Sequence, residues 1–305
     1  MKKDLLSVVD PGPAGVEELL EQALVMKQGG LRCLLPWRSV ALLFEKPSLR
    51  TRVSFDLAVT QLGGHCLYLS PQEVGLGQRE PVPDVARVLS RYVDCIVARV
   101  FSHDTLVDLA RNASVSVINA LSDHEHPCQA LADFLTIREH KGRLRGVRLA
   151  YVGDGNNVAR SLALLSAMLG VDFSIASPPG YELDDATVRE ARSLSTTSGT
   201  SVSMTRDPAE AVEGADAVYT DTWTSMGQEK EAVVRREAFA SFQVNAALMS
   251  RAKADAMFMH CLPAHHGEEV TSEVLNGASS VVFDQAENRL HAQKAVLAQI
   301  LIPAD

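Results

Sequence analysis

The chain has 305 residues, of which 46% are hydrophobic, and it carries a formal net charge of −9 at pH 7. This length suggests two domains of ordinary size rather than one small core. The negative charge argues against a nucleic-acid-binding surface, which needs basic patches. None of the apolar runs approaches the roughly 20 residues of a membrane span, and residues 1–6 lack the apolar core of a secretion signal. We therefore expect neither nucleic acid nor a membrane as a partner.

The cysteines indicate a reducing compartment. The chain has an odd number of them, and no two are spaced as a CxxC pair or a metal knuckle. They are Cys33, Cys66, Cys95, Cys128 and Cys261. This usage predicts a cytoplasmic protein whose thiols are reduced.

A short apolar run at residues 40–44 predicts a buried strand. Pro47 ends the strand, and Ser48 lies where the N-cap of a following helix should be. Apolar residues then recur at spacings of three, four and seven between residues 55 and 62, as on one face of a helix. The stretch is therefore predicted to be a strand, a tight turn and a helix.

Ser48, Arg50, Thr51 and Arg52 crowd this predicted turn. A helix N-terminus offers free backbone N–H groups and a positive dipole end, and two guanidinium groups and two hydroxyls join them here. Together these are the groups that bind a phosphate. For two arginines alone, a capped helix with solvated charges is the more common interpretation. The Pro-Ser step before Arg-Thr-Arg favours the phosphate site.

The rest of the first half alternates between strands and helices, and residues 70–83 are expected to form a long polar loop. Such alternation indicates a parallel sheet covered on both faces. Arg99 lies at the carboxyl end of one predicted strand. The expected strands are 65–69, 95–100 and 115–118, and the expected helices are 16–27, 83–92 and 103–112.

Another helix is predicted to run from about Pro127 to residue 140. This places His126 and Gln129 at a helix N-terminus. His124 and His126 are only two residues apart, and no third ligand of zinc spacing follows, so we expect no metal there. The alternative role for His126 is that of an ordinary histidine in a cap region.

Residues 141–146 are polar and bounded by glycine, and they are the best candidate for the start of a second domain. After the strand predicted at 147–152 comes Gly-Asp-Gly-Asn-Asn-Val. A dinucleotide-binding fingerprint would need its third glycine where Val158 stands. Asn157 in this stretch is a candidate for hydrogen bonding to an amino acid, and the alternative is an Asx turn.

The second half also alternates, and two polar residues follow the carboxyl ends of its strands, where α/β sheets bind ligands. These are Asp221 and Cys261, although a lone cysteine is more often a small buried hydrophobe. The expected strands are 172–176, 201–205, 216–220, 256–259 and 281–284, and the expected helices are 184–197 and 287–301.

The predicted fold class is α/β, with two Rossmann-like domains, each a parallel sheet flanked by helices, and an active site in the cleft between them. Residues 1–141, joined by a C-terminal helix at 286–305, would form the first domain, and residues 142–285 the second. The first offers groups for an anion. The second offers Asp221 for an ammonium group and Asn157 for a carboxylate, which are the needs of a zwitterionic amino acid.

Four motifs now resemble one family. In order they are Ser48-x-Arg50-Thr51-Arg52, His126-Pro127-x-Gln129, Asp221-x-x-x-Ser225-Met226-Gly227 and His260-Cys261-Leu262-Pro263. They resemble the ornithine carbamoyltransferases of the aspartate/ornithine carbamoyltransferase family. The aspartate enzymes are similar only in the first two motifs.

The resemblance implies a reaction in which carbamoyl phosphate and L-ornithine give L-citrulline and phosphate. It implies no metal and no organic cofactor, and a homotrimer or a multiple of trimers. The first domain would bind carbamoyl phosphate and the second would bind ornithine.

The resemblance also implies roles for single residues. Arg99, His126 and Thr51 would donate to the carbamoyl oxygen as it gains charge. The phosphate would bind Ser48, Arg50, Thr51 and the backbone N–H of Leu49. The carbamoyl NH₂ would lie near Gln129, Arg289 and the backbone carbonyls of Cys261 and Leu262.

On the ornithine side, Asp221 would bind the α-ammonium group, and Asn157 and the backbone at Met226 would bind the carboxylate. The loop with Ser225 and Met226 is the expected lid. The attacking amine must be neutral although free amines have a pKa near ~10. Cys261 would orient that amine or accept its proton.

The chain departs from the family at His266, where many relatives carry Arg, and at Gly75, where some place a phosphate-contacting Gln. Gln78 lies nearby, and no contact is assigned to it. Three other functions are less well supported. A nucleophilic enzyme using Cys261 with His260 would need neighbours on a strand, which point to opposite faces, to pair. Val158 argues against a nicotinamide-dependent dehydrogenase, and an amino-acid sensor would have lost the phosphate-binding residues, which are present. Within the family, putrescine and N-acetylornithine are the alternative substrates, although neither offers Asp221 an α-ammonium group.

Overall fold

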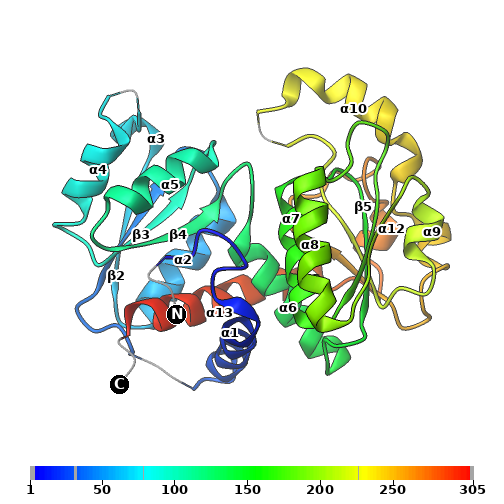
Figure 1. The fold of residues 1–305 in the computed structure, drawn as a ribbon, viewed down its shortest axis with the longest axis horizontal. Helices are drawn as coiled ribbons and strands as arrows, with labels where there is room; N and C mark the ends of the chain where they lie inside the picture. Colours follow the sequence, from blue (N-terminus) through cyan, green and yellow to red (C-terminus); the bar gives the residue numbers. More distant parts are fainter. Residues whose placement is uncertain (1–3, 31–32, 78, 226, 303–305) are drawn as a thin grey trace. The chain divides into compact units, whose positions relative to one another are not determined.

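The computed structural model describes residues 4–30, 33–77, 79–225 and 227–302. The chain divides into two compact units. Unit 1 comprises Met1–Leu135 and Glu287–Asp305, and unit 2 comprises Thr136–Ala286. Each contains its own parallel sheet flanked by helices (Figure 1). The predicted fold class of two α/β domains with parallel sheets is confirmed.

The sheet of unit 1 has the strand order β2-β1-β3-β4, with all neighbouring strands parallel. The central strands are buried on both faces, as near-continuous apolar runs predict. A segment before the first helix adds to the free edge of β4, where Leu5 N–H donates to Val117 O over 2.9 Å. The strands are β1 Ser39–Phe44, β2 His65–Leu69, β3 Cys95–Arg99 and β4 Ser116–Leu121.

The helices of this half cover both faces of the sheet, with α4 and α5 on one face and α1, α2 and α13 on the other (Figure 1). The C-terminal helix is fastened to unit 1, because Lys294 Nζ donates to Gln61 at 3.2 Å and Lys27 Nζ donates to Asn288 at 2.8 Å. The helices are α1 Gly12–Lys27, α2 Leu49–Gln61, α3 Pro71–Val74, α4 Val82–Leu89, α5 His103–Asn112, α6 Pro127–Lys141 and α13 Val282–Leu301.

The sheet of unit 2 has the strand order β7-β6-β5-β8-β9, again all parallel. Helices α7 and α8 cover one face, and α9 and α12 cover the other (Figure 1). The strands are β5 Arg148–Val152, β6 Asp172–Ala176, β7 Val202–Thr205, β8 Ala217–Thr220 and β9 Met257–His260. The helices are α7 Asn157–Leu169, α8 Asp185–Ser198, α9 Pro208–Val212, α10 Ala232–Phe239, α11 Ala246–Met249 and α12 Ser272–Leu275, with 3-10 turns at Glu229–Glu231 and Ala240–Phe242.

One predicted strand is wrong. The three apolar residues 281–283 and Asp284 lie at the start of helix α13, which begins at Val282, and Gln285 N–H donates to Val281 O over 2.9 Å. Within the described residues, the contact of this segment with β9 is limited to an isolated parallel bridge between Phe258 and Ser280. A short apolar run is compatible with a strand or a buried helix, and here Val282 is buried whereas Phe283 is 73% exposed.

Smaller differences concern element ends and one loop. The predicted loop at 70–83 contains the short helix α3, which Ser70 and Glu73 open with a capping box. Helix α4 ends at Leu89 rather than residue 92, and β4 extends to Leu121 rather than residue 118. The short helices α9, α11 and α12 and helix α10 were not predicted.

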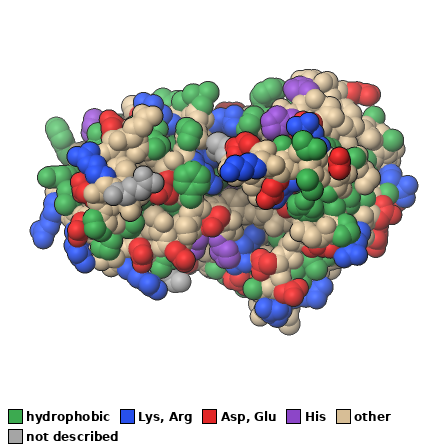
Figure 2. Space-filling model, turned by 90° about the horizontal axis from the view of Figure 1, so that it is seen from above, with side chains coloured by type: hydrophobic (Ala, Val, Ile, Leu, Met, Phe, Trp, Pro, Cys, Tyr) green, Lys and Arg blue, Asp and Glu red, His purple; other side chains and the backbone are tan. Residues whose placement is uncertain are grey.

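The surface agrees with the composition. On the face seen in Figure 2, basic and acidic side chains are interspersed rather than separated by sign. Among the helices that the structure describes, none combines the length and apolar character needed to cross a bilayer.

Gly155 shows why glycine is needed between β5 and α7. Its N–H donates to Tyr181 O over 2.8 Å, and a Cβ at this position would lie 2.3 Å from Leu183 N and 2.4 Å from the Glu182 carbonyl carbon. The glycine allows this close approach of two backbone segments, a role that involves no nucleotide.

We expect Gly155→Ala to lower the free energy of unfolding by about 1–3 kcal/mol, because rigid backbone must move to admit the methyl group. Gly15→Ala in helix α1 is the control, since its Cβ would meet only the Pro11 side chain, at 3.0 Å. Urea denaturation measures both. Equal stability of Gly155→Ala and the parent chain would contradict this account.

Candidate active site

The candidate residues gather where each sheet reverses its strand order. In unit 1 the order reverses between β1 and β3. The turn at Ser48, predicted to bind phosphate, follows β1, and Arg99 is the last residue of β3. In unit 2 it reverses between β5 and β8, which are followed by Asn156 and Asp221. Open α/β sheets bind ligands at such switch points, beyond the carboxyl ends of the strands.

The turn after β1 is built as the sequence predicts. Ser48 is the N-cap of α2 and accepts a hydrogen bond from Thr51 N–H at 3.3 Å. The Thr51 hydroxyl oxygen accepts from Ser48 Oγ at 3.0 Å and from Arg289 Nη2 at 2.7 Å. With both lone pairs used, the hydroxyl proton of Thr51 is directed to another acceptor, such as a ligand oxygen. Leu49, the first residue of α2, is 77% exposed.

The two arginines of this turn have different surroundings. Arg50 is half-buried, whereas the guanidinium group of Arg52 lies over the Tyr68 ring, 3.9 Å from its centroid. Arg52 is therefore engaged with an aromatic side chain.

Three cation-forming side chains of unit 1 are buried close together: Arg99, His126 and Arg289. Burial and then the positive charges of Arg289 and Arg99 hold the pKa of His126 well below its ordinary 6.5. The imidazole is therefore neutral at neutral pH and keeps one N–H donor. Two guanidinium groups and a neutral imidazole in a buried setting form a suitable environment for an anionic oxygen.

Gln129 is oriented from its own helix. Its Nε2 donates to Asp133 Oδ1 at 2.8 Å, whereas its buried Oε1 has no hydrogen-bond partner among the described residues. A buried acceptor without a donor is costly, so a ligand N–H group would stabilise it. The sequence analysis missed Asp133, although its i+4 spacing from Gln129 on a predicted helix was the available signal.

The segment before His126 is fixed by the N-terminal part of the chain. The buried Glu125 carboxylate accepts from Ser7 Oγ at 2.5 Å and from Val8 N–H at 3.0 Å. Ser122 Oγ accepts from Glu125 N–H at 3.2 Å. This support spans more than 100 residues of sequence, and no local pattern could have indicated it.

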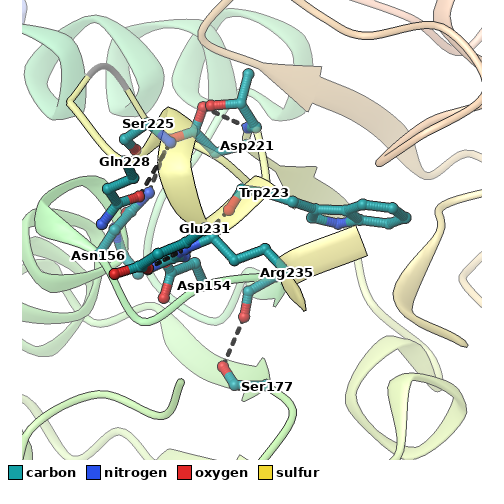
Figure 3. Close-up of polar contacts among 12 residues, drawn as sticks. Asp154, Asn156, Ser177, Asp221, Trp223, Ser225, Gln228, Glu231 and Arg235 are labelled. Carbon is teal, nitrogen blue, oxygen red and sulfur yellow. Dashed lines mark hydrogen bonds and ion pairs between the residues drawn. The ribbon is translucent and has the colours of Figure 1, made fainter. Parts of the chain in front are cut away.

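In unit 2 the Asp221 carboxylate is the centre of a hydrogen-bond network (Figure 3). Its Oδ2 accepts from Asn156 Nδ2 at 2.9 Å, and its Oδ1 accepts from Cys261 Sγ at 3.0 Å and from Thr222 N–H at 2.8 Å. Asn156 is also the N-cap of α7, because its Oδ1 accepts from the N–H groups of Val158 and Ala159.

The structure thus places Asn156, which the sequence analysis did not select, beside Asp221. Asn157 is the first residue of α7 and is half-buried. Both residues lie at the same helix N-terminus, where a carboxylate is favoured. The Asn-Asn pair in the sequence did not distinguish the cap from the residue that follows it.

Cys261 and His260 face different partners. The Cys261 thiol donates to Asp221, whereas His260 Nδ1 accepts from Leu262 N–H at 2.8 Å and His260 Nε2 lies 3.2 Å from the buried Glu269. The two side chains do not form a nucleophile–base pair, as expected for neighbours at the end of a strand. Leu262 follows with φ +57°, a conformation uncommon for a branched residue.

The loop after Asp221 is described in part. Ser225 N–H donates to Gln228 Oε1 at 3.1 Å (Figure 3). Met226, predicted to bind ornithine, and Gln78 lie outside the described residues.

Two groups of side chains within the described residues bring potential metal ligands within 4.8 Å of one another. One is Asp221, His260 and Cys261, and the other is His265, Glu268 and Glu269. In the first group both ring nitrogens of His260 already have hydrogen-bond partners. The expectation of no metal stays a prediction.

The buried neutral His126 should make stability depend on pH. Below pH 6.5 the imidazole becomes protonated in the unfolded chain but stays neutral in the folded chain, because its pKa there is lower. The contribution of His126 to the free energy of unfolding is therefore present above pH 6.5 and is lost as the pH falls. We expect urea denaturation of His126→Gln to show a shallower loss of stability between pH 7 and 5 than the parent, by at most about 1.4 kcal/mol per pH unit. Exposed His65→Gln is the control. Parallel curves for His126→Gln and the parent would contradict the assignment.

Comparisons with known proteins point to one family for both halves of the chain. Two family models match: "Aspartate/ornithine carbamoyltransferase, carbamoyl-P binding domain" over residues 3–139, and "Aspartate/ornithine carbamoyltransferase, Asp/Orn binding domain" over residues 145–300. The ornithine carbamoyltransferase of Pyrococcus abyssi is 53% identical over 303 residues, covering 98% of this chain and 96% of the relative. That of Bacillus subtilis is 52% identical over 299 residues, covering 98% and 94%.

Solved structures agree as well. The ornithine carbamoyltransferase from Pyrococcus furiosus has a TM-score of 0.94 at 53% identity, covering 98% of this chain and 96% of that chain. The enzyme from Thermus thermophilus has a TM-score of 0.91 at 47% identity, covering 99% and 100%. Because both halves of the chain match, over nearly its full length, this chain belongs to the aspartate/ornithine carbamoyltransferase family.

Proposed function

We propose that this chain transfers the carbamoyl group of carbamoyl phosphate to the δ-amine of L-ornithine, giving L-citrulline and phosphate in arginine metabolism. The observation that carries the choice of ornithine is the buried Asp221 carboxylate at the switch point of unit 2. An α-ammonium group is its natural partner. Relatives at 52–53% identity carry the name ornithine carbamoyltransferase, and that of P. furiosus is named anabolic.

In this proposal unit 1 binds carbamoyl phosphate. The phosphate would bind at the N-terminus of α2, to donors from Ser48, the Leu49 N–H, Arg50 and Thr51. The Thr51 proton is available for it because Ser48 and Arg289 occupy the oxygen's lone pairs. The N-cap Ser48 and the distant Arg289 thus fix the direction of the Thr51 hydroxyl group before the ligand binds.

The carbamoyl group would bind to the buried polar residues of unit 1. Arg99 and the neutral His126 donate to the carbonyl oxygen as attack makes it negative, and Arg289 adds positive charge. Gln129 Oε1 accepts from the carbamoyl NH₂, which supplies the donor that this buried oxygen needs. The further contacts of this NH₂ with the backbone carbonyls of Cys261 and Leu262 stay a prediction.

Unit 2 binds ornithine. Each oxygen of the Asp221 carboxylate can accept about two hydrogen bonds, so the α-ammonium group can join the donors already present. Asn157 and the amino end of α7 would take the carboxylate. Ser225 belongs to the loop that would close on the substrate, and the contact expected from Met226, which lies outside the described residues, stays a prediction. Cys261, 3.0 Å from Asp221, would orient the δ-amine, or accept its proton as the thiol passes its own proton to the Asp221 carboxylate.

The substrate class is tested by Asp221→Asn, which keeps the shape and removes the charge. We expect kcat/KM for ornithine to fall about 100-fold or more, since a charged hydrogen-bonding partner is lost, while the KM for carbamoyl phosphate changes less than about threefold. A citrulline assay measures both. Exposed Asp185→Asn is the matched control.

The same assay with putrescine, N-acetylornithine and aspartate as amines tests the alternatives. Neither putrescine nor N-acetylornithine has an α-ammonium group for Asp221, and we expect product from ornithine alone. Faster turnover of one of these amines by the parent chain would overturn the proposed role of Asp221.

We further propose a homotrimer or a multiple of trimers in the cytoplasm. Support for self-association comes from α2, where Leu49, Val53 and Leu57 are spaced by four residues and are 77%, 45% and 45% exposed. An exposed apolar stripe of this kind is typical of interfaces. All five cysteines lie among the described residues and none of them forms a disulfide, which supports a reducing compartment.

Leu57→Glu places a charge in this stripe away from the phosphate turn, and we expect it to shift the particle mass from three chains toward one. Light scattering after size-exclusion chromatography measures the mass, and the exposed Val233→Glu on α10 is the control. A single-chain mass for the parent would contradict the trimer.

A further inference from the structure

We propose that Arg235 is a positioning residue for ornithine: it fixes residues 221–223, which follow β8, so that Asp221 meets the substrate. The inference rests on the proposed role of Asp221. Arg235 lies in α10 and touches no reacting group in this account. It acts through the backbone of the segment that Asp221 begins.

Arg235 joins three parts of unit 2 (Figure 3). Its Nη1 donates to Asp154 Oδ2 at 2.7 Å and to the Trp223 carbonyl at 3.0 Å. Its Nε donates to Glu231 at 3.0 Å. The guanidinium group also lies 4.9 Å from the centroid of the Tyr181 ring. Only 6% of Arg235 is exposed, so these partners hold a charge removed from water.

The partners of Arg235 lie on both sides of Asp221. Asp154 belongs to the turn between β5 and α7, and two residues later Asn156 donates to Asp221 at 2.9 Å. Trp223 lies two residues after Asp221. One guanidinium group therefore connects the turn that orients Asp221 with the backbone that carries it.

The planar guanidinium group of arginine is needed to contact Asp154 and the Trp223 carbonyl together. It presents donors in fixed directions, so one side chain can hold a carboxylate and a carbonyl at once, whereas a lysine ammonium group is a single compact centre. Burial raises the pKa of the Asp154 carboxyl, and Arg235 opposes that rise. Removing one member of a buried charge pair leaves the other uncompensated.

A merely structural ion pair would stabilise the unit without favouring one substrate. The packing of α10 has a separate anchor, because Phe239 of this helix is buried against the Trp223 ring with centroids 5.9 Å apart. Loss of the Arg235 fork is therefore expected to change the backbone near Asp221 more than the packing of α10.

The test compares Arg235→Lys, Asp154→Asn and the control Arg236→Lys, whose side chain is 54% exposed and lies 3.6 Å from Glu268. We expect Arg235→Lys and Asp154→Asn to raise the KM for ornithine about tenfold or more and to leave the KM for carbamoyl phosphate within about twofold. The control should change neither. Equal effects on both substrates, or no effect on either, would overturn the inference.

Hydrogen exchange without ligand provides a readout that does not depend on activity. In Arg235→Lys, peptides from residues 221–225 should exchange at least about tenfold faster, while peptides from α2 should not change. If the parent chain made no citrulline, the proposed function would fail, and exchange would still decide whether Arg235 orders this segment. Unchanged exchange in the variant would refute the positioning role.

Discussion

The Asp221 carboxylate is the constraint around which unit 2 is arranged. A buried negative charge is stable only when donors surround it. Here Asn156, Cys261 and the Thr222 N–H supply them, and they come from three different places in the sequence. The switch point between β5 and β8 makes this convergence possible, since the carboxyl ends of neighbouring parallel strands meet at one edge.

Unit 1 is arranged around the opposite charge. Arg99, His126 and Arg289 are buried together, and the burial that would penalise three cations leaves the histidine neutral instead. The protein thereby keeps two fixed positive charges and one neutral donor for an anionic ligand. Through the hydrogen bond from Arg289 to Thr51, the C-terminal helix contacts the turn at the start of α2.

Much of this was predictable from sequence because the signals were local. A strand, a Pro-Ser step and a capped helix indicated the turn at Ser48, and the order of four motifs indicated the family. The strand expected at residues 281–284 was wrong because three apolar residues followed by an aspartate do not define a period. Asn156, Glu125 and Arg235 were missed because their roles depend on partners distant in the sequence.

The central claim is that a bond forms between the carbamoyl carbon and the δ-nitrogen of ornithine. The most direct measurement supplies the protein with ¹³C-carbamoyl phosphate and δ-¹⁵N-ornithine and records the product by NMR. The account predicts a one-bond ¹³C–¹⁵N coupling in citrulline and the release of phosphate in equal amount. A ureido carbon bonded to the unlabelled α-nitrogen, or phosphate release without a coupled product, would contradict it.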